Sequence, residues 1–449
     1  MFEDIIKLNN GANFYLADLH IHTPVWPHIR LPSGLKIKKN KDKKELAKKY
    51  IEKAIEKGIK ILGITEHNDL SWIDYIRKAA ENTELVIFPG FEIASSSGSD
   101  GIHLLCLFVP NTEITYIDRI LSKLLPPQRY HNGKPRNSDK PFEEILSIVK
   151  EHNGICIAAH STRENGLLKS AKGENRIKFF TNPNLLAIEI PKSKEKLGEF
   201  EKNIISGKDP NYRRKYPIAC VNFSDAKSID EIGKKATYIK LSAFTVEGLR
   251  QAFLDWESRI RLQDEVKEHL FSKIIAIKWE GGFLDGNLIH FNNNLNCIIG
   301  GKGTGKSTIV ETIRYAFDIK PHATKIEEQY NELLEAAFKS GSKISILIES
   351  HYPSPKKYII ERSKPGRPIV LEEDGTPRPD LKPTDIFNLE IFSQKEIYEI
   401  SKDPSFQLRL IDKFIENKLD KLREEEKEIC LLYTSPSPRD LSTSRMPSS

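Results

Sequence analysis

Histidine and acidic side chains recur at the ends of short apolar runs in the first half of the 449-residue sequence. His20 and His22 occupy alternate positions of one run, so in a strand both side chains point to the same face and can reach one metal ion. Imidazole and carboxylate ligands together suit Zn, Mn or Fe ions. A single such histidine is more often a satisfied surface or core residue, but a series at successive run ends does not fit that interpretation. The candidate metal ligands are His20, His22, His28, His67, Glu92, His103, His160 and Asp225.

Two of the acidic and basic residues are candidates for the chemical step itself. Glu66 and His67 are the predicted catalytic residues, since Glu66 could orient or deprotonate an attacking water. An equally open alternative is that Glu66 fixes His67 or another ligand from behind. Asp18, beside the histidine pair, is interpreted in that second way.

The runs that carry these residues are each the length of one strand. Amphipathic stretches separate them, which predicts parallel strands alternating with helices and chemistry at the strand ends, as in barrel-type α/β folds. Two polar, basic segments, Pro126–Lys140 and Lys192–Tyr216, predict loops or lids near the mouth of the site. The runs span residues 14–23, 59–69, 84–94, 101–109, 154–161, 185–191 and 217–226.

The order HxH, His, TEH, FPGFE, His, AAH and SDA resembles the polymerase-and-histidinol-phosphatase (PHP) superfamily over residues 14–250. The resemblance implies a distorted (β/α)7 barrel in which the candidate ligands hold two or three ions and phosphate esters are hydrolysed. The family pattern closes with Asp-x-His, whereas this sequence has Asp225, Ala226 and Lys227. A protonated lysine cannot ligate a cation. Three interpretations stay open: a working two-metal site, a site where Lys227 replaces the missing cation, and a site that has lost its function.

A nucleotide-binding loop is indicated in the second half of the chain. Residues 300–307 fit G-x-x-x-x-G-K-[ST] between a predicted strand at 295–300 and a predicted helix at 307–317. In this motif backbone N–H groups surround the phosphates, Lys306 reaches the terminal phosphates and the Ser307 hydroxyl holds Mg²⁺. The predicted residues for binding ATP with Mg are Gly300, Gly303, Gly305, Lys306, Ser307, Thr308 and Gln394.

Residues 272–428 resemble the N-terminal ATPase half of structural-maintenance-of-chromosomes (SMC) and recombination-repair proteins. The segment FSQKEI resembles their Q-loop, which implies that Gln394 contacts Mg²⁺ or the attacking water. The acidic residues and signature motif of that group do not occur before Ile429. The resemblance therefore implies that ATP turnover needs a further half-domain and a homodimer formed through the ATPase heads. Together the two halves resemble TrlF-like fusions of a PHP domain and an ATPase.

The predicted organisation is α/β throughout, in two domains. Residues 1–262 form the PHP-like barrel and 272–416 the first half of a P-loop ATPase head of the ABC/SMC type, and 417–429 begin a coiled coil. From Cys430 lysine vanishes and Ser, Pro and Thr dominate. The segment CLLYTSPSPRD can be encoded by a sequencing adapter, so 430–449 is interpreted as an artefactual disordered tail on a truncated protein. A natural disordered tail is the alternative.

Composition limits the function classes. The 39% apolar content supports globular folding, and the lack of a long apolar run or a leader predicts a cytoplasmic protein with no membrane partner. The five cysteines, none in a CxxC pair, are expected to be reduced. The lysine-rich stretch Lys36–Lys49 fits either nucleic-acid contact or a solvated helix face. The leading hypothesis is a metal-dependent phosphodiesterase acting on nucleic acid, with access controlled by the ATPase. A small-molecule phosphomonoesterase and a non-catalytic ATP-dependent sensor or scaffold are the alternatives.

Overall fold

The computed structural model describes residues 2–25, 39–99, 101–191, 193–266, 271–321, 324–351 and 355–414. The chain divides into two compact units. Unit 2 comprises residues 10–269, and unit 1 comprises residues 1–9 together with 270–449. The first nine residues, which the sequence analysis assigned to the barrel, thus belong with the second half of the chain.

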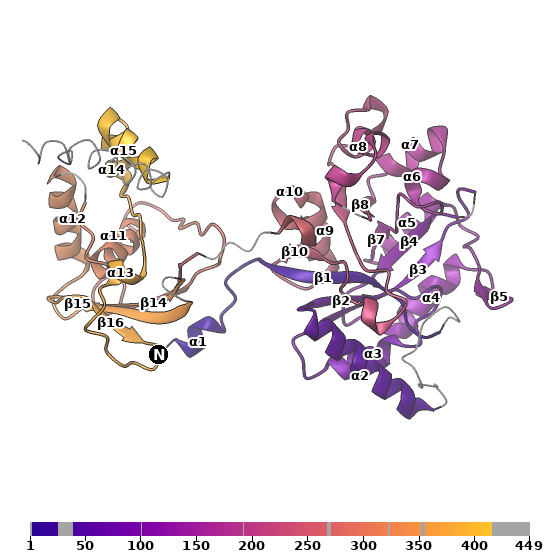
Figure 1. The fold of residues 1–449 in the computed structure, drawn as a ribbon, viewed down its shortest axis with the longest axis horizontal. Coiled ribbons are helices and arrows are strands. Elements are labelled where there is room, and N and C mark those ends of the chain that lie inside the picture. Colours follow the sequence, from indigo (N-terminus) through magenta and orange to yellow (C-terminus); the bar gives the residue numbers. More distant parts are fainter. Residues whose placement is uncertain are drawn as a thin grey trace, which may run out of the picture. The chain divides into compact units, whose positions relative to one another are not determined.

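Unit 2 is an α/β fold built on a nine-stranded sheet (Figure 1). In spatial order the strands are β11 (Ile260–Leu262), β10 (Thr237–Leu241), β1 (Asn13–Ile21), β2 (Ile61–Ile64), β3 (Val86–Ala94), β4 (His103–Leu107), β7 (Ile155–Ala158), β8 (Leu185–Glu189) and β9 (Ala219–Val221). The helices are α2 (Asn40–Glu56), α3 (Ile73–Ala80), α4 (Ile114–Leu124), α5 (Phe142–Glu151), α6 (Leu167–Ser170), α7 (Gly173–Thr181), α8 (Glu199–Ile205), α9 (Val246–Leu254) and α10 (Trp256–Arg259). A small hairpin of β5 (Tyr130–His131) and β6 (Lys134–Pro135) stands apart from the sheet.

The sheet curls until it is nearly closed. After β9 the chain returns to the end of β1, where Ile21 and Ala226 form a parallel bridge. The N–H of His22 donates to the carbonyl of Ala226 at 3.1 Å. This return brings Asp225 beside the histidines of β1, so the barrel-like closure assembles residues that are far apart in the sequence.

The prediction of an all-parallel barrel is wrong for β4. The pairs β1–β2, β2–β3, β7–β8 and β8–β9 are parallel, but β4 runs antiparallel to both β3 and β7. Only the short segment 95–102 joins β3 to β4. A parallel crossover needs a dozen or more residues, so this connection can only reverse the chain direction.

Alternating residues of the strands enter two different cores. On β4, Leu104 and Cys106 pack with the apolar faces of α2 to α5, whereas Leu105 and Leu107 point to the other face and pack with residues of α9. The same period of two holds on β7, where Ile155 and Ile157 belong to the second core. Helices α2 to α5 thus cover one face, and α9 packs against the other face, which forms the interior.

Unit 1 contains a five-stranded antiparallel sheet. The strand order is β13 (Leu288–His290), β12 (Lys273–Glu280), β14 (Lys343–Ser350), β15 (Lys356–Ser363) and β16 (Ile369–Glu372). Its helices are α1 (Glu3–Ile6), α11 (Lys306–Ala316), α12 (Thr324–Ala337), α13 (Pro383–Ile386), α14 (Gln394–Ile400) and α15 (Pro404–Phe414). One face packs with α11 and α12 around the buried Trp279, and Phe2 and Ile5 cover part of the other face. β14 and β15 pair antiparallel as a hairpin.

The strand predicted at 295–300 is not formed. Residues 295–300 have no strand assignment, and Leu295 and Ile299 are 89% and 90% exposed. An apolar strand that enters a glycine loop is normally paired with neighbouring strands at its edges and covered by helices on both faces. No described strand of unit 1 pairs with this segment, so its side chains remain in solvent.

Some predictions fall outside the described residues. These are the ligand His28, the coiled coil at 417–429 and the tail at 430–449. The family of unit 1 also stays a prediction at this stage. Among the described helices, none has the length and apolarity needed to cross a membrane.

Candidate metal centre

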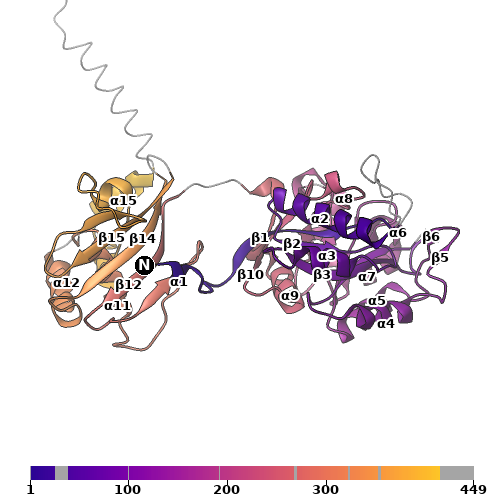
Figure 2. The ribbon, with the colours of Figure 1, turned by 90° about the horizontal axis from the view of Figure 1, so that it is seen from below.

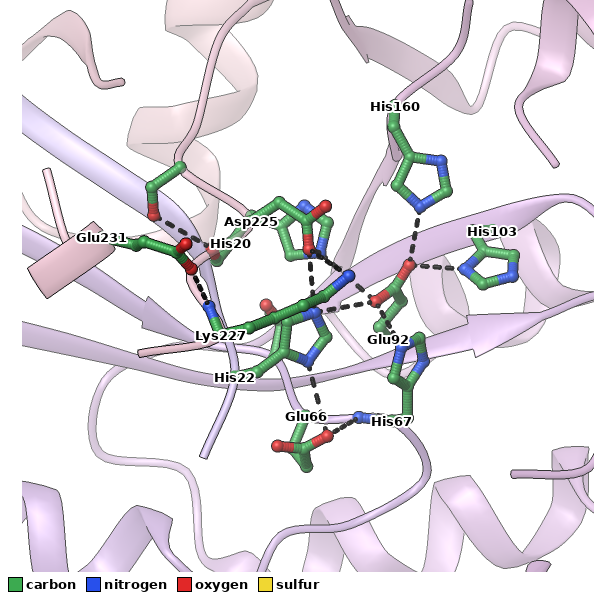
Figure 3. A network of polar contacts seen from close by, with 12 residues as sticks. His20, His22, Glu66, His67, Glu92, His103, His160, Asp225, Lys227 and Glu231 are labelled. Atoms are coloured by element: carbon green, nitrogen blue, oxygen red, sulfur yellow. Dashed lines mark hydrogen bonds and ion pairs between the residues drawn. The ribbon is translucent and has the colours of Figure 1, made fainter. Parts of the chain in front are cut away.

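The carboxylate of Glu92 lies at the centre of a cluster of five histidines (Figure 3). Its Oε1 atom is 2.6 Å from His103 Nδ1 and 3.2 Å from His160 Nε2. Its Oε2 atom is 3.2 to 3.4 Å from the Nε2 atoms of His20, His22 and His67. Glu92 is only 1% exposed. A buried anion surrounded by imidazoles is the kind of donor set that binds divalent ions.

The donor atoms divide into two groups that share Glu92. One group is His20, His22 and Glu92, and the other is His67, Glu92 and His103. Within each group the ligand atoms lie within 4.8 Å of one another. The cluster could therefore hold two ions that share Glu92 as a ligand.

Strand periodicity explains why these side chains meet. On β3, Glu92 lies four residues after Phe88, and on β4, His103 lies two residues before Leu105. Because side chains alternate between the two faces of a strand, Glu92 and His103 point to the interior face, as Phe88 and Leu105 do. The interior face is apolar along most of each strand and carries ionisable groups at the strand ends. His20 lies near the end of β1, within a register irregularity between Asp18 and Ile21, and His22 directly follows the strand.

Two candidate ligands have strained backbones. His160 has φ 26° and Asp225 has φ 51°, a left-handed conformation that residues other than glycine rarely adopt. Such strain concentrates at functional sites, where the surroundings hold it in place. His160 Nδ1 is buried and has no hydrogen-bond partner among the described residues. An unpaired imidazole nitrogen beside four other histidines fits a site built for metal ions.

Glu189, at the end of β8, is a residue that the sequence analysis missed. Its Oε2 atom is 3.0 Å from His20 Nδ1 and accepts the backbone N–H of His160 at 2.8 Å. It therefore fixes one ring and one strained backbone of the cluster. The signal that could have identified it is its place two residues after Ala187, which faces the interior.

Glu66 lies behind the cluster rather than within it. Its Oε1 atom contacts His22 Nδ1 at 3.4 Å and accepts the N–H of His67 at 2.9 Å, while its Oε2 atom accepts the N–H of Thr23 at 2.6 Å. Asp18 is fully buried and accepts N–H bonds from Ser224 and Gly233. Both carboxylates hold the segments that carry the ligands. For Glu66 this geometry favours the positioning interpretation over the role of general base.

Burial and mutual charge set the pKa values of the cluster. Burial alone would raise the pKa of Glu92, but His67, His20 and His103 hold it well below its usual range. Burial, reinforced by His22 and His103, lowers the pKa of His67 to about 4 despite the opposing Glu92. His67 is therefore neutral at pH 7, which is the form that ligates a metal. Burial would lower the pKa of His22, yet Asp225 and Glu66 raise it to about 9.

Two cations flank Asp225 at the rim of the site. Arg163 Nη1 donates to Asp225 Oδ2 at 2.8 Å. Lys227 Nζ is 3.6 Å from Asp225 Oδ1 (Figure 3). The side chains of Arg163 and Lys227 are 49% and 47% exposed. The same Oδ1 atom is 3.2 Å from His22 Nε2, so the lysine ammonium shares a carboxylate oxygen with a candidate ligand.

Residues 41–190 match the family model of the PHP domain. This segment contains Glu66, His67, Glu92, His103 and His160, whereas His20, His22 and Asp225 lie outside it. The PHP-matched segment is thus the part of unit 2 that supplies the central carboxylate. A comparison with curated proteins found no match.

Three solved structures are similar to the chain at low identity. One is a protein from Bifidobacterium adolescentis assigned as a metal-dependent phosphoesterase, with 12% identity and a TM-score of 0.33 over 49% of this chain and 88% of that chain. A two-domain protein from Bacteroides vulgatus containing a predicted PHP-like metal-dependent phosphoesterase has 12% identity and a TM-score of 0.37, covering 61% and 80%. An amidohydrolase from Chromobacterium violaceum with bound sulfate and no metal has 14% identity and a TM-score of 0.34, covering 55% and 97%. All three TM-scores are below 0.5, and we draw nothing further from these structures.

The predicted nucleotide loop lies in unit 1, at the start of α11. Gly303 and Gly305 have φ of 82° and 90°, which glycine adopts without strain. Lys306 Nζ donates to the carbonyl oxygens of Gly300 and Gly301 at 2.8 Å and 2.5 Å. Ser307 is exposed, Thr308 is buried, and the side chain of Gln394 lies outside the described part of the structure.

Proposed function

We propose that unit 2 is a metal-dependent phosphodiesterase that acts on nucleic acid. The observation that carries this proposal is the contact of both Glu92 oxygens with five histidines in a buried cluster that could hold two ions. The match of residues 41–190 to the PHP domain supports the same chemistry. Mn, Zn or Fe ions are the candidates that suit this mixture of imidazole and carboxylate.

In this proposal each part of the cluster has a separate task. His20 and His22 would hold one ion and His67 and His103 the other, with Glu92 in both ligand groups. His160 and Asp225 would supply further ligands. When bound, the ions would polarise the phosphoryl group and activate water for attack. Glu66 and Glu189 keep the imidazoles oriented. The depth of the ligands excludes bulk water from the carboxylate of Glu92.

Arg163 and Lys227 are suited to bind the phosphate itself. Both are cations at the rim, and both already contact the carboxylate of Asp225. A phosphate oxygen near the cluster would compete for the same donors. This geometry supports two ions with Lys227 serving in place of a third, over the interpretation of a site that has lost its function.

We also propose that unit 1 binds ATP with Mg²⁺ and controls access to the phosphodiesterase. The specific observation is the position of Lys306, whose ammonium is held inside the glycine loop by the carbonyls of Gly300 and Gly301. A polyphosphate bound by the loop would attract the same ammonium. The SMC-like organisation and the homodimer are proposals that rest on the sequence resemblance, and the cytoplasmic location is a proposal that rests on the apolar pattern of the sequence.

The experiment is hydrolysis of bis-p-nitrophenyl phosphate with added Mn²⁺ or a chelator, together with the metal content of the purified protein. Glu92→Gln keeps the side-chain shape and removes the charge, and Glu164→Gln, an exposed carboxylate nearby, is the matched control. The proposal expects manganese-dependent cleavage that Glu92→Gln abolishes and Glu164→Gln retains. Turnover of p-nitrophenyl phosphate alone would favour the phosphomonoesterase. Bound metal without any turnover would favour the sensor or scaffold.

A further inference from the structure

The basic hairpin formed by β5 and β6, residues 129–136, is tied directly to the metal centre. The side-chain amide of Asn68 donates to the carbonyl oxygens of both hairpin strands, to Arg136 at 2.8 Å and to Arg129 at 3.3 Å. The backbone N–H of Asn68 donates to the carbonyl of Glu92 at 3.1 Å. One buried residue, Asn68, thus connects the backbone of Glu92 to the base of the hairpin.

A second contact strengthens this connection. The hydroxyl of Tyr130 donates to the carbonyl of His67 at 2.6 Å. At the tip, Asn132 and Gly133 have φ of 48° and 72°, the pair of positive values that defines a tight type I′ turn. The hairpin is therefore short, and its base is hydrogen-bonded to the candidate ligand His67 and to the next residue, Asn68.

The charges on the hairpin are of two kinds. The guanidinium of Arg129 is 2.7 Å from Asp118 and 2.8 Å from the hydroxyl of Ser122, so it stabilises the junction with α4. His131, Lys134 and Arg136 are exposed, and their side chains make no hydrogen bond or ion pair with any described residue. Lys134 and Arg136 therefore carry positive charges that no described residue neutralises, and these charges can meet an external anion.

The hairpin and the histidines near the end of β1 lie at the same end of unit 2. Within unit 2, Figures 1 and 2 both place β5 at the end toward which β1 runs. His20 and His22 lie at that same end of β1. A phosphate chain that entered the cluster would therefore continue toward the hairpin.

We propose that the β5–β6 hairpin binds the phosphates next to the scissile one and that the substrate is a single-stranded polynucleotide. This inference rests on the proposed phosphodiesterase function. The ligands are recessed, since His20 is 0%, Glu92 1% and His160 8% exposed. A flexible single strand can feed one phosphate into such a recess while its neighbours meet exposed cations, whereas a duplex holds its backbone on a rigid cylinder.

The first test measures binding without catalysis. A fluorescently labelled oligothymidylate of about ten nucleotides is titrated with chelator-treated protein over a series of salt concentrations. Each lost phosphate contact on a single strand lowers the slope of log affinity against log salt by about 0.7. The double variant Lys134→Ser, Arg136→Ser should lose about twice that slope and bind severalfold more weakly. An unchanged slope and affinity in this variant would overturn the inference.

The matched control is the double variant Lys44→Ser, Lys48→Ser. It removes the same charge from the other lysine-rich surface, where α2 and α3 line a cavity of about 350 Å³. The inference expects this control to bind as the parent does. Loss of slope in the control and not in the hairpin variant would assign the strand to α2 and overturn the proposal.

The second test removes the anchor. Asn68 has φ 55°, so Asn68→Gly keeps the backbone conformation and deletes only the amide that holds the hairpin. The ratio of kcat/KM for the oligonucleotide to kcat/KM for bis-p-nitrophenyl phosphate should fall, mainly through a higher KM for the oligonucleotide. An unchanged ratio would contradict the proposed role of the hairpin and would leave the proposed phosphodiesterase function intact. If the parent cleaves no diester, the proposed function fails, while the binding series still decides whether the hairpin contacts the strand.

Discussion

Glu189 holds His20 from behind, with its Oε2 atom 3.0 Å from His20 Nδ1, while the opposite ring nitrogen faces Glu92 at 3.2 Å. Burial alone would raise the pKa of Glu189, but His20 and His160 together bring this pKa below its usual range. The carboxylate is therefore ionised and can fix the ring orientation. A metal ion at Nε2 would bind an imidazole whose other nitrogen is already oriented and made more basic.

Glu189→Ala should lower metal affinity by about 10- to 100-fold, the usual effect of removing the partner of a ligating histidine. Glu189→Gln keeps an acceptor oxygen and loses the charge, so an intermediate affinity is expected. Competition with a fluorescent chelator measures both. Equal affinity in the parent and the alanine variant would mean that His20 does not depend on this contact, or does not ligate.

Lys227→His should increase the number of bound ions, because it places an imidazole where an ammonium now faces Asp225. Lys227→Met has a similar length and no charge, and should not increase that number. Metal analysis of the dialysed proteins measures the difference. If the histidine and methionine variants bind the same number of ions as the parent, the third position is absent for a reason other than the lysine.

The stability of the metal-free protein should fall as the pH rises. The folded-state pKa of His22 is about 9 against an ordinary value of 6.5. Because the folded state binds this proton more tightly, the contribution is fully present below pH 6.5 and is lost as the pH rises through about 9. Thermal unfolding of chelator-treated protein in that window should show the fall, and saturating Mn²⁺ should reduce it.

The control for this pH effect is His22→Asn, which cannot titrate in the window. The difference in unfolding temperature between parent and variant should shrink from pH 6.5 toward pH 9. A constant difference would show that His22 is not protonated in the metal-free fold. Proton release on adding Mn²⁺, measured in two buffers, provides an independent check.

In unit 1, Lys306→Met should weaken binding of a fluorescent ATP analogue by roughly ten- to hundredfold, as expected for the loss of a charged hydrogen bond. Lys302→Met removes an exposed lysine of the same loop and should have little effect. Titration by fluorescence anisotropy in the presence of Mg²⁺ compares them. Equal losses in both variants would indicate nonspecific attraction of the phosphates, and no binding by the parent would remove the nucleotide proposal.

The sequence predicted the strands that carry the site more reliably than their directions. The alternation of His20 and His22 and the strand-end position of Glu92 were enough to expect a shared site, and the structure brings these side chains together. The direction of β4 was mispredicted because the short connection before His103 was not weighed against the length of a parallel crossover.

Two other differences have a similar origin in tertiary context. Glu189 belongs to no short motif, and only the curvature of the sheet brings it to His20 across 169 residues. The apolar run at 295–299 has the composition of a strand, but a strand exists only when another strand accepts its hydrogen bonds. The local sequence pattern indicates which secondary structure a segment favours, but it does not show whether a pairing strand or a contacting residue is present in the fold.

The exposed segment 295–300, which contains Leu295 and Ile299, should affect the solubility of the protein. Together with Phe283, which is 57% exposed, these side chains offer apolar surface to the solvent. Such a surface favours contact between copies as the concentration increases. Colloidal stability should therefore be limited by unit 1, and light scattering should rise with concentration sooner for the whole chain than for residues 10–269.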